Sequence, residues 1–110
     1  MKRGDLVTHA GPSDYGRKPR PALVIQSDRL AGSESVLLCL ITSEEEMPPG
    51  LPHIAVSPTP ANGLRVPSYI MVEKILAARR TKCGNVVGHL EPAMMEQVNT
   101  SLALVIGLAD

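Results

Sequence analysis

Apolar residues in this chain are gathered in short runs, and the stretches between the runs are rich in proline, glycine and charge. Two runs, residues 21–27 and 35–42, are almost continuously apolar and rich in branched side chains. Runs of this kind are typical of strands that are buried on both faces. Because only a short connection separates the two runs, we predict that they form antiparallel neighbours at the centre of a sheet.

Shorter patterns predict the rest of the fold. Four further strands are expected at residues 5–9, 53–57 (an edge strand), 68–75 and 85–90. The last segment is predicted to be helical, with Pro92 as its first residue. Apolar residues then recur every three or four positions along one helical face, at Met95, Val98, Leu102, Val105 and Ile106. Several strands followed by one helix indicate an α+β fold, or a small β-barrel with appended helices.

The end of this helix is more apolar than packing against one sheet requires. Leu104 and Leu108 lie off the apolar stripe, and polar residues become rare after Ser101. Apolar side chains on two sides of one helix need two surfaces to cover them. We therefore expect a second subunit to pack against this end of the helix.

Composition indicates one globular domain with a local basic patch. The 110 residues are expected to form a single domain, residues 1–110, whose core is aliphatic because Phe and Trp are absent. The formal net charge is zero, yet residues 1–20 hold five basic and two acidic side chains, whereas residues 83–110 hold no Lys or Arg. This pattern argues against a general attraction to nucleic acid and favours a basic patch near the N-terminal end.

The spacing of polar residues excludes several kinds of site. His9, His53 and His89 are isolated, and Cys39 and Cys83 fit no metal-binding pattern, so no metal is expected. The chain has no glycine-rich phosphate loop and no dinucleotide fingerprint, so no organic cofactor is expected. No apolar segment approaches the ~20 residues that span a membrane, and the N-terminal residues do not form a signal peptide. These features predict a cytoplasmic protein with no membrane partner.

The clearest candidates for chemistry lie where two predicted strands end. Pro19 and Pro21 restrict the backbone on both sides of Arg20, which holds this arginine at the mouth of a buried strand. In an antiparallel pair with a short connection, the first strand starts at the edge where the second ends, so Arg20 is expected near Thr42 and Ser43. A guanidinium and a hydroxyl together suit a phosphodiester. Spacing alone does not distinguish such a site from two solvated strand ends.

Several segments around these residues resemble one known family. They are RGDLV at residues 3–7, KPRPALVIQSD at 18–28, LITS at 40–43, GL at 63–64, PSYIMVEKI at 67–75 and VGHL at 87–90. In this order they are similar to the MazF/PemK family of toxin endoribonucleases, and the likeness covers nearly the whole chain. The resemblance implies an α+β fold built as a compact SH3-like antiparallel β-barrel with short helices and a C-terminal helix, assembled as a homodimer.

The same resemblance implies a function and a set of site residues. It implies metal-independent cleavage of single-stranded RNA at short sequences, and inhibition by a cognate antitoxin that lies across the active site. Arg20 would stabilise charge on the phosphate while the ribose 2′-OH attacks it, and Thr42 would position that phosphate. Further RNA contacts are expected from Tyr15, Arg17, Lys18, Ser43 and Glu73.

Two departures from the family pattern change these expectations. Some members carry an Arg-x-Asp pair where this chain has Met71 and Glu73, so a second catalytic arginine is missing there and Glu73 is left as either an RNA contact or a structural residue. The loop at residues 10–19 is also shorter than the resemblance leads us to expect, which predicts an altered sequence preference.

Two alternatives to an endoribonuclease remain open. A non-enzymatic toxin of the same fold would bind a protein target such as DNA gyrase, and an SH3-like interaction module would have no toxic activity of its own. Neither alternative requires Arg20 and Thr42 to meet at one edge of the sheet.

Overall fold

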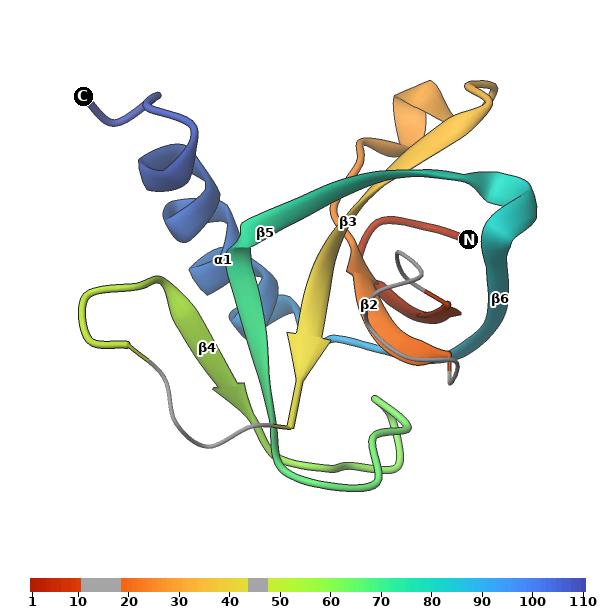
Figure 1. Cartoon of the computed structure of the whole chain (residues 1–110), viewed down its shortest axis with the longest axis horizontal. Coiled ribbons are helices and arrows are strands. Elements are labelled where there is room, and N and C mark those ends of the chain that lie inside the picture. The colour runs from red at the N-terminus through yellow and green to blue at the C-terminus, as the bar shows by residue number, and fades with distance from the viewer. Residues whose placement is uncertain (11–18, 44–47) are drawn as a thin grey trace.

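Six strands and one C-terminal helix make up the described part of the computed structural model, which covers residues 1–10, 19–43 and 48–110 (Figure 1). The elements are β1 (Asp5–His9), β2 (Arg20–Val24), β3 (Ser35–Thr42), β4 (His53–Val56), β5 (Ser68–Arg79), β6 (Cys83–His89) and α1 (Pro92–Val105), with single 3-10 turns at Asp28–Leu30 and Arg80–Lys82. Each predicted strand is present, and α1 begins at Pro92 as predicted. The α+β fold class is therefore confirmed.

All strand pairs in this sheet are antiparallel, in the order β4-β5-β3-β2-β1-β6. The predicted pairing of β2 with β3 at the centre of the sheet is confirmed, with Ala22 opposite Leu40 and Leu23 opposite Cys39. The predicted edge position of β4 is also confirmed.

Strand β5 continues to Arg79, beyond the predicted end at residue 75, and contains a large bulge. Met71 pairs with Leu40 of β3, whereas Ile75 pairs with the very next β3 residue, Cys39, so residues 72–74 have no partner in β3. The strand bends sharply there (Figure 1) and then pairs with the first half of β3. Extra residues in one strand increase its twist and bend. The bulge allows a single strand to run along both halves of a curled sheet.

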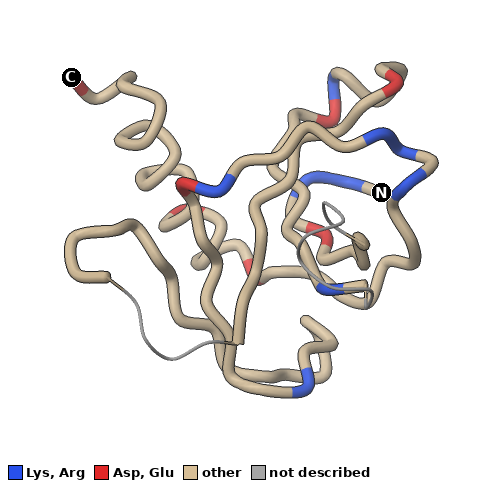
Figure 2. Tube along the Cα trace, viewed as in Figure 1, with Lys and Arg blue, Asp and Glu red and all other residues tan. Residues whose placement is uncertain are grey.

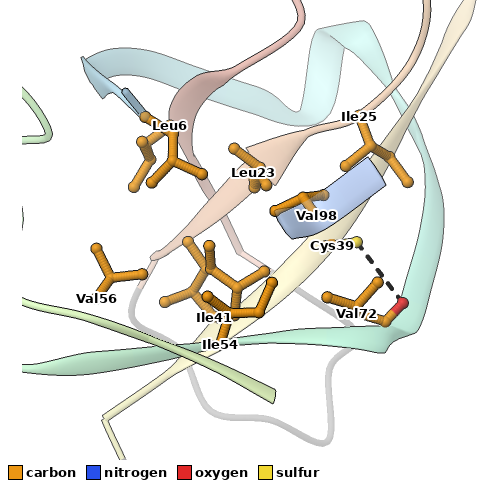
Figure 3. Packing of buried hydrophobic residues seen from close by; sticks show 11 residues of the cluster. Leu6, Leu23, Ile25, Cys39, Ile41, Ile54, Val56, Val72 and Val98 are labelled. Atoms are coloured by element: carbon orange, nitrogen blue, oxygen red, sulfur yellow. Dashed lines mark hydrogen bonds between the residues drawn. The ribbon is translucent and has the colours of Figure 1, made fainter. Parts of the chain in front are cut away.

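The core consists of two aliphatic clusters on opposite faces of the inner strands. One cluster is covered by α1 and contains Leu6, Leu23, Ile25, Cys39, Ile41, Ile54, Val56, Ile70, Val72, Leu90 and Val98 (Figure 3). The other lies inside the curl of the sheet and contains Val7, Ala22, Val24, Val36, Leu38 and Ala78. Because β1, β2 and β3 contribute to both clusters, these strands are buried on both faces, as the apolar runs at residues 21–27 and 35–42 predicted.

Cys39 is part of the first cluster and is fully buried. Burial, with a smaller effect from the Glu73 carboxylate, raises the pKa of its thiol to about 12. The Sγ–H group donates a weak hydrogen bond to the Val72 carbonyl oxygen at 3.8 Å (Figure 3). The thiol is therefore protonated at neutral pH and serves as a packing group.

The edges of the sheet do not close into the SH3-like barrel that the resemblance implies. In the described residues, β4 and β6 form no ladder, and the loop that follows β4 lies against β6 instead. The His89 N–H donates to the Ala61 carbonyl oxygen at 2.8 Å, and the Gly88 backbone packs directly on that of Asn62. The sheet is therefore curled but open, because a loop occupies the place where the two edge strands would have to meet.

Helix α1 covers the first cluster only along part of its length. Val98 is fully buried, and Met94, Met95, Leu102 and Val105 pack against the cluster. The side chains of Leu104, Ile106 and Leu108 are 60%, 57% and 76% exposed. The last turn of the chain thus presents an apolar surface to solvent. In the part of the chain that the structure describes, no helix is both long enough and apolar enough to cross a membrane.

The contact between Gly88 and Asn62 leads to a stability prediction. A methyl group at residue 88 would overlap the Asn62 backbone, whereas a methyl group at Gly32 would meet nothing within 4 Å. We expect Gly88→Ala to lower the free energy of unfolding by about 1–3 kcal/mol, the usual cost of overpacking, and Gly32→Ala to change it by less than about 0.5 kcal/mol. Urea unfolding of both variants measures this difference. Equal stability of the two would show that the loop does not pack on β6 as described.

Candidate active site

A cavity of about 570 Å³ lies at the edge of the sheet where β2 begins and β3 ends. Its described lining comes from five parts of the chain: Arg20 and its two flanking prolines, the end of β3, the loop between β4 and β5 together with the first residue of β5, one residue from β1, and one residue from β6. The volume falls within the range of roughly 300–1,000 Å³ that is usual for ligand sites. The cavity is therefore large enough to receive part of a nucleotide chain.

Arg20 and Thr42 lie together on the wall of this cavity. The β2–β3 ladder runs from Val24–Leu38 to Ala22–Leu40, and Arg20 and Thr42 follow at the end of the pair where β2 begins and β3 ends. The Thr42 residue is 8% exposed, and Arg20 is exposed. Both residues line the cavity together with Ser43. The meeting of strand ends that the sequence predicted is present, while the catalytic roles of Arg20 and Thr42 stay predictions.

The cavity carries positive charge that no described acidic group neutralises. Its lining includes Arg20 and Arg65 and, among the described residues, no Asp, Glu, His or Cys. The ion pairs found in the described part of the chain, His53–Glu73 and His89–Asp5, lie elsewhere. Hydroxyl groups of Thr8, Thr42, Ser43 and Ser68 complete the polar lining. Guanidinium groups form strong, often bidentate hydrogen bonds with phosphate oxygens, and hydroxyl groups can donate further hydrogen bonds to them.

The sequence does not identify Arg65 as a site residue, because it lies between the predicted strands at residues 53–57 and 68–75 and belongs to no recognised motif. The loop between β4 and β5 carries this one basic residue and no acidic residue (Figure 2). The loop lies at the same end of the molecule as the start of β2 (Figure 1). Sequence spacing gives no signal for this approach, since it depends on how the loop folds back toward β6.

Asn62 holds this loop in a fixed shape. The side chain is buried, and its Oδ1 accepts hydrogen bonds from the backbone N–H groups of Thr59 and Leu64, both at 3.0 Å. Its Nδ2 donates to the Ser57 carbonyl oxygen at 2.9 Å. Gly63 follows with a φ of +70°, a conformation that glycine adopts without strain. The wall that carries Arg65 is therefore organised before any ligand binds.

Glu73, which was predicted to contact RNA, does not line this cavity. It lies in the bulge of β5, where its Oε2 is 2.8 Å from Nε2 of His53 in β4. Burial alone would raise the pKa of the Glu73 carboxyl, but the hydrogen bond with His53 and its own backbone outweigh this effect and hold the pKa below its usual value. The carboxylate thus helps to join β4 to the bulge, and an RNA contact by Glu73 stays a prediction.

The other titratable groups with shifted pKa values on β1, Asp5 and His9, do not line the cavity. The Asp5 carboxylate accepts from the Lys2 N–H at 2.7 Å and lies 2.6 Å from His89 Nδ1; burial opposes ionisation, but these contacts keep its pKa below the usual value. Burial lowers the pKa of His9, which pairs with Arg20 across β1 and β2. In the described ranges, no three His, Cys, Asp or Glu side chains are grouped so that they could hold a metal ion.

Three of the predicted RNA contacts, Tyr15, Arg17 and Lys18, lie outside the described residues. Of the remaining predicted site residues, Arg20, Thr42 and Ser43 share the cavity and Glu73 lies apart from it. The structure adds Arg65 and the hydroxyls of Thr8 and Ser68 to the set.

Comparison with known proteins shows which family the chain resembles. Residues 2–106 match the family described as "PemK-like, MazF-like toxin of type II toxin-antitoxin system". The chain is 36% identical over 109 residues to a protein of Mycolicibacterium smegmatis named "Probable endoribonuclease MazF", covering 99% of both chains.

Solved structures share the fold. An endoribonuclease from a mycobacterial species, solved in complex with its cognate antitoxin, has 24% identity and a TM-score of 0.78 over 98% of this chain and 96% of that chain. MazF from Deinococcus radiodurans has 18% identity and a TM-score of 0.76 over 97% and 96% of the two chains. At these identities the structural likeness shows the fold alone.

Proposed function

The chain belongs to the family of PemK-like, MazF-like toxins of type II toxin-antitoxin systems, and we propose that it is a sequence-specific endoribonuclease that cleaves single-stranded RNA in the cytoplasm. The observation that supports this proposal is that Arg20, at the start of β2, and Thr42, at the end of β3, line one cavity. The relative from Mycolicibacterium smegmatis, named a probable endoribonuclease, supports the reaction type.

The lining of the cavity suits a reaction that uses no resident metal. Protein sites for divalent cations are built mainly from carboxylate, carbonyl, imidazole or thiolate ligands, whereas the polar side chains of the described lining are arginines and hydroxyls. The ribose 2′-OH supplies the nucleophile, so the enzyme has to position the chain and stabilise charge. These are tasks that a guanidinium and hydroxyl groups perform well.

We propose the following step at this site. The 2′ oxygen of one nucleotide attacks the adjacent phosphorus, and the bond from phosphorus to the 5′ oxygen of the next nucleotide breaks. Arg20 binds the non-bridging oxygens as their negative charge grows, and Thr42 donates a hydrogen bond to the same phosphate. One proton leaves O2′ and one is delivered to O5′, so the products are a 2′,3′-cyclic phosphate end and a 5′-OH end.

Base recognition in this proposal depends on few aromatic groups. The chain has only two, Tyr15 and Tyr69, so extensive base stacking is excluded and hydrogen bonds must contribute to sequence preference. Tyr15 is the proposed stacking residue, and Arg17, Lys18 and Ser43 are proposed to follow the RNA backbone. Glu73 is less suited to this role because its carboxylate is hydrogen-bonded to His53.

The alternative of a gyrase-binding toxin has no support in the comparisons. The mycobacterial relatives described here are named as endoribonucleases. The cavity holds two arginines, and its described lining contains no carboxylate to pair with them. Binding to a protein target does not require such an arrangement.

An antitoxin is the second proposed partner. The endoribonuclease from a mycobacterial species was solved with its cognate antitoxin, and the positively charged cavity of this chain suits an acidic segment. Arg17 and Lys18 are proposed to contact that segment, so replacing both with Gln should weaken the complex mainly at low salt. Titrations of antitoxin at two salt concentrations measure this effect, and a loss that is independent of salt would contradict it.

The exposed apolar end of α1 supports a homodimer. Leu104, Ile106 and Leu108 are all more than half exposed, and a second copy of the chain is the proposed cover. Light scattering should give a mass about twice the 11.7 kDa of one chain. We expect the double variant Leu104→Glu and Leu108→Glu to be monomeric. The control is Leu30→Glu, at a 55% exposed residue outside α1, and this variant should stay dimeric. A monomeric wild-type protein would contradict the proposal.

Cleavage of RNA in the presence of EDTA tests the proposed activity directly. We expect the wild-type protein to cut single-stranded RNA under these conditions, and Arg20→Ala to lower the rate by about 10²–10³-fold, the usual cost of removing a donor that stabilises developing charge. Arg29→Ala, at an exposed arginine that does not line the cavity, should leave the rate unchanged. Absence of cleavage, or cleavage that does not depend on Arg20, would overturn the assignment.

A further inference from the structure

Arg65 is a second cation in the cavity that holds Arg20. It comes from a separate part of the chain, the loop between β4 and β5, and its side chain is exposed. Within the described residues, neither its guanidinium nor that of Arg20 is in an ion pair. Arginines on protein surfaces frequently bind a nearby carboxylate, and here the described cavity lining contains none.

Two guanidinium groups line one cavity whose described lining carries no negative charge. A cleft lined by charge of one sign raises the local electrostatic potential and attracts a polyanion of the opposite sign. Single-stranded RNA carries one phosphate per nucleotide, so two neighbouring phosphates are available to two arginines. The charge of the cavity therefore fits an RNA chain better than it fits a single isolated phosphate.

The loop that carries Arg65 is fixed on both sides of this residue. On one side, the Asn62 side chain binds the Leu64 N–H at 3.0 Å, and Gly63 packs against the backbone of Val87 in β6. On the other side, the buried Ser68 donates from Oγ to the Val66 carbonyl oxygen at 2.9 Å. A cation on a fixed backbone binds a ligand with less loss of conformational entropy than one on a free loop.

Given the proposed endoribonuclease activity, we propose that Arg65 binds the RNA phosphate next to the one that is cleaved. Arg20 and Thr42 come from the neighbouring strands β2 and β3, line the same cavity and are the residues proposed above to share the scissile phosphate. Arg65 comes from the loop between β4 and β5, which forms another part of the cavity wall. A contact to a phosphate that does not react is equally strong before and during the reaction, so it strengthens binding without accelerating the chemical step.

Steady-state kinetics on a short single-stranded RNA that the wild-type protein cuts test this role. We expect Arg65→Ala to raise KM about tenfold, the usual effect of losing one charged hydrogen bond, and to change kcat by less than about twofold. Arg65→Lys keeps the charge and should recover part of the loss. Arg29→Ala is the matched control outside the cavity, and thermal unfolding of each variant shows that the fold is retained.

A binding measurement separates Arg65 from the chemistry. The probe is the same RNA with a 2′-deoxy nucleotide at the cleaved position, which lacks the attacking hydroxyl. Its dissociation constant is measured from low to moderate salt for the wild-type protein, Arg65→Ala and Arg29→Ala. Loss of one phosphate contact should reduce the slope of log K against log salt by about 0.7 for Arg65→Ala and leave the slope of the control unchanged.

The outcomes distinguish this inference from the proposed function. If the wild-type protein cleaves RNA through Arg20 but Arg65→Ala leaves KM and the salt slope unchanged, Arg65 does not bind RNA and the inference is wrong. A fall in kcat at unchanged KM would also overturn it, because Arg65 would then act on the scissile phosphate. If the protein binds the deoxy probe through Arg65 but cuts no RNA, the proposed function fails and the phosphate contact stands.

Discussion

The pairing of β2 with β3 is the constraint on which the proposed site depends. Ala22 lies opposite Leu40, and this register directs Arg20, two residues before Ala22, and Thr42, two residues after Leu40, to the same edge of the sheet. A shift of one residue would turn the side chains of β2 to the opposite face of the sheet. Such a shift is strongly disfavoured, because Leu23 belongs to the cluster under α1 while Ala22 and Val24 belong to the cluster inside the curl. Burial on both faces therefore aligns the two residues proposed to hold the scissile phosphate.

The curled shape of the sheet supplies the second wall of the cavity. The bulge at residues 72–74 lets β5 follow both halves of the sheet, and the loop before β5 then lies against β6. Asn62, with its three side-chain hydrogen bonds, fixes this loop, and Gly88 leaves room for the loop backbone. The same contacts leave the sheet open, since the loop takes the place of a ladder between β4 and β6. The packing of this loop on β6 therefore accounts both for the open edge of the sheet and for the second wall of the cavity.

Local sequence patterns were sufficient to predict most strands and the helix. Contacts between residues far apart in the sequence could not be predicted in this way. The continuous apolar run at residues 35–42 and the position of Pro92 identified β3 and the start of α1, because burial and helix initiation act over a few residues. The bulge in β5 was missed, since Val72 and Lys74 fit the alternation of an ordinary strand. Arg65 was missed because its neighbours read as a turn, and no spacing rule connects that turn with Arg20. Resemblance to a family supplied the roles of Arg20 and Thr42, and strand-end geometry alone had left them undecided.

A double-mutant cycle on Arg20 and Thr42 tests most directly whether the two residues hold one phosphate. The values of kcat/KM are measured for the wild-type protein, Arg20→Ala, Thr42→Val and the double variant, where Val keeps the shape of the buried Thr42 side chain. If both groups act on the same phosphate, the double variant should lose less than the product of the two single losses, with a coupling energy of about 1 kcal/mol or more. Losses that multiply to within about 0.3–0.5 kcal/mol would show that the two residues act independently, which would contradict the account.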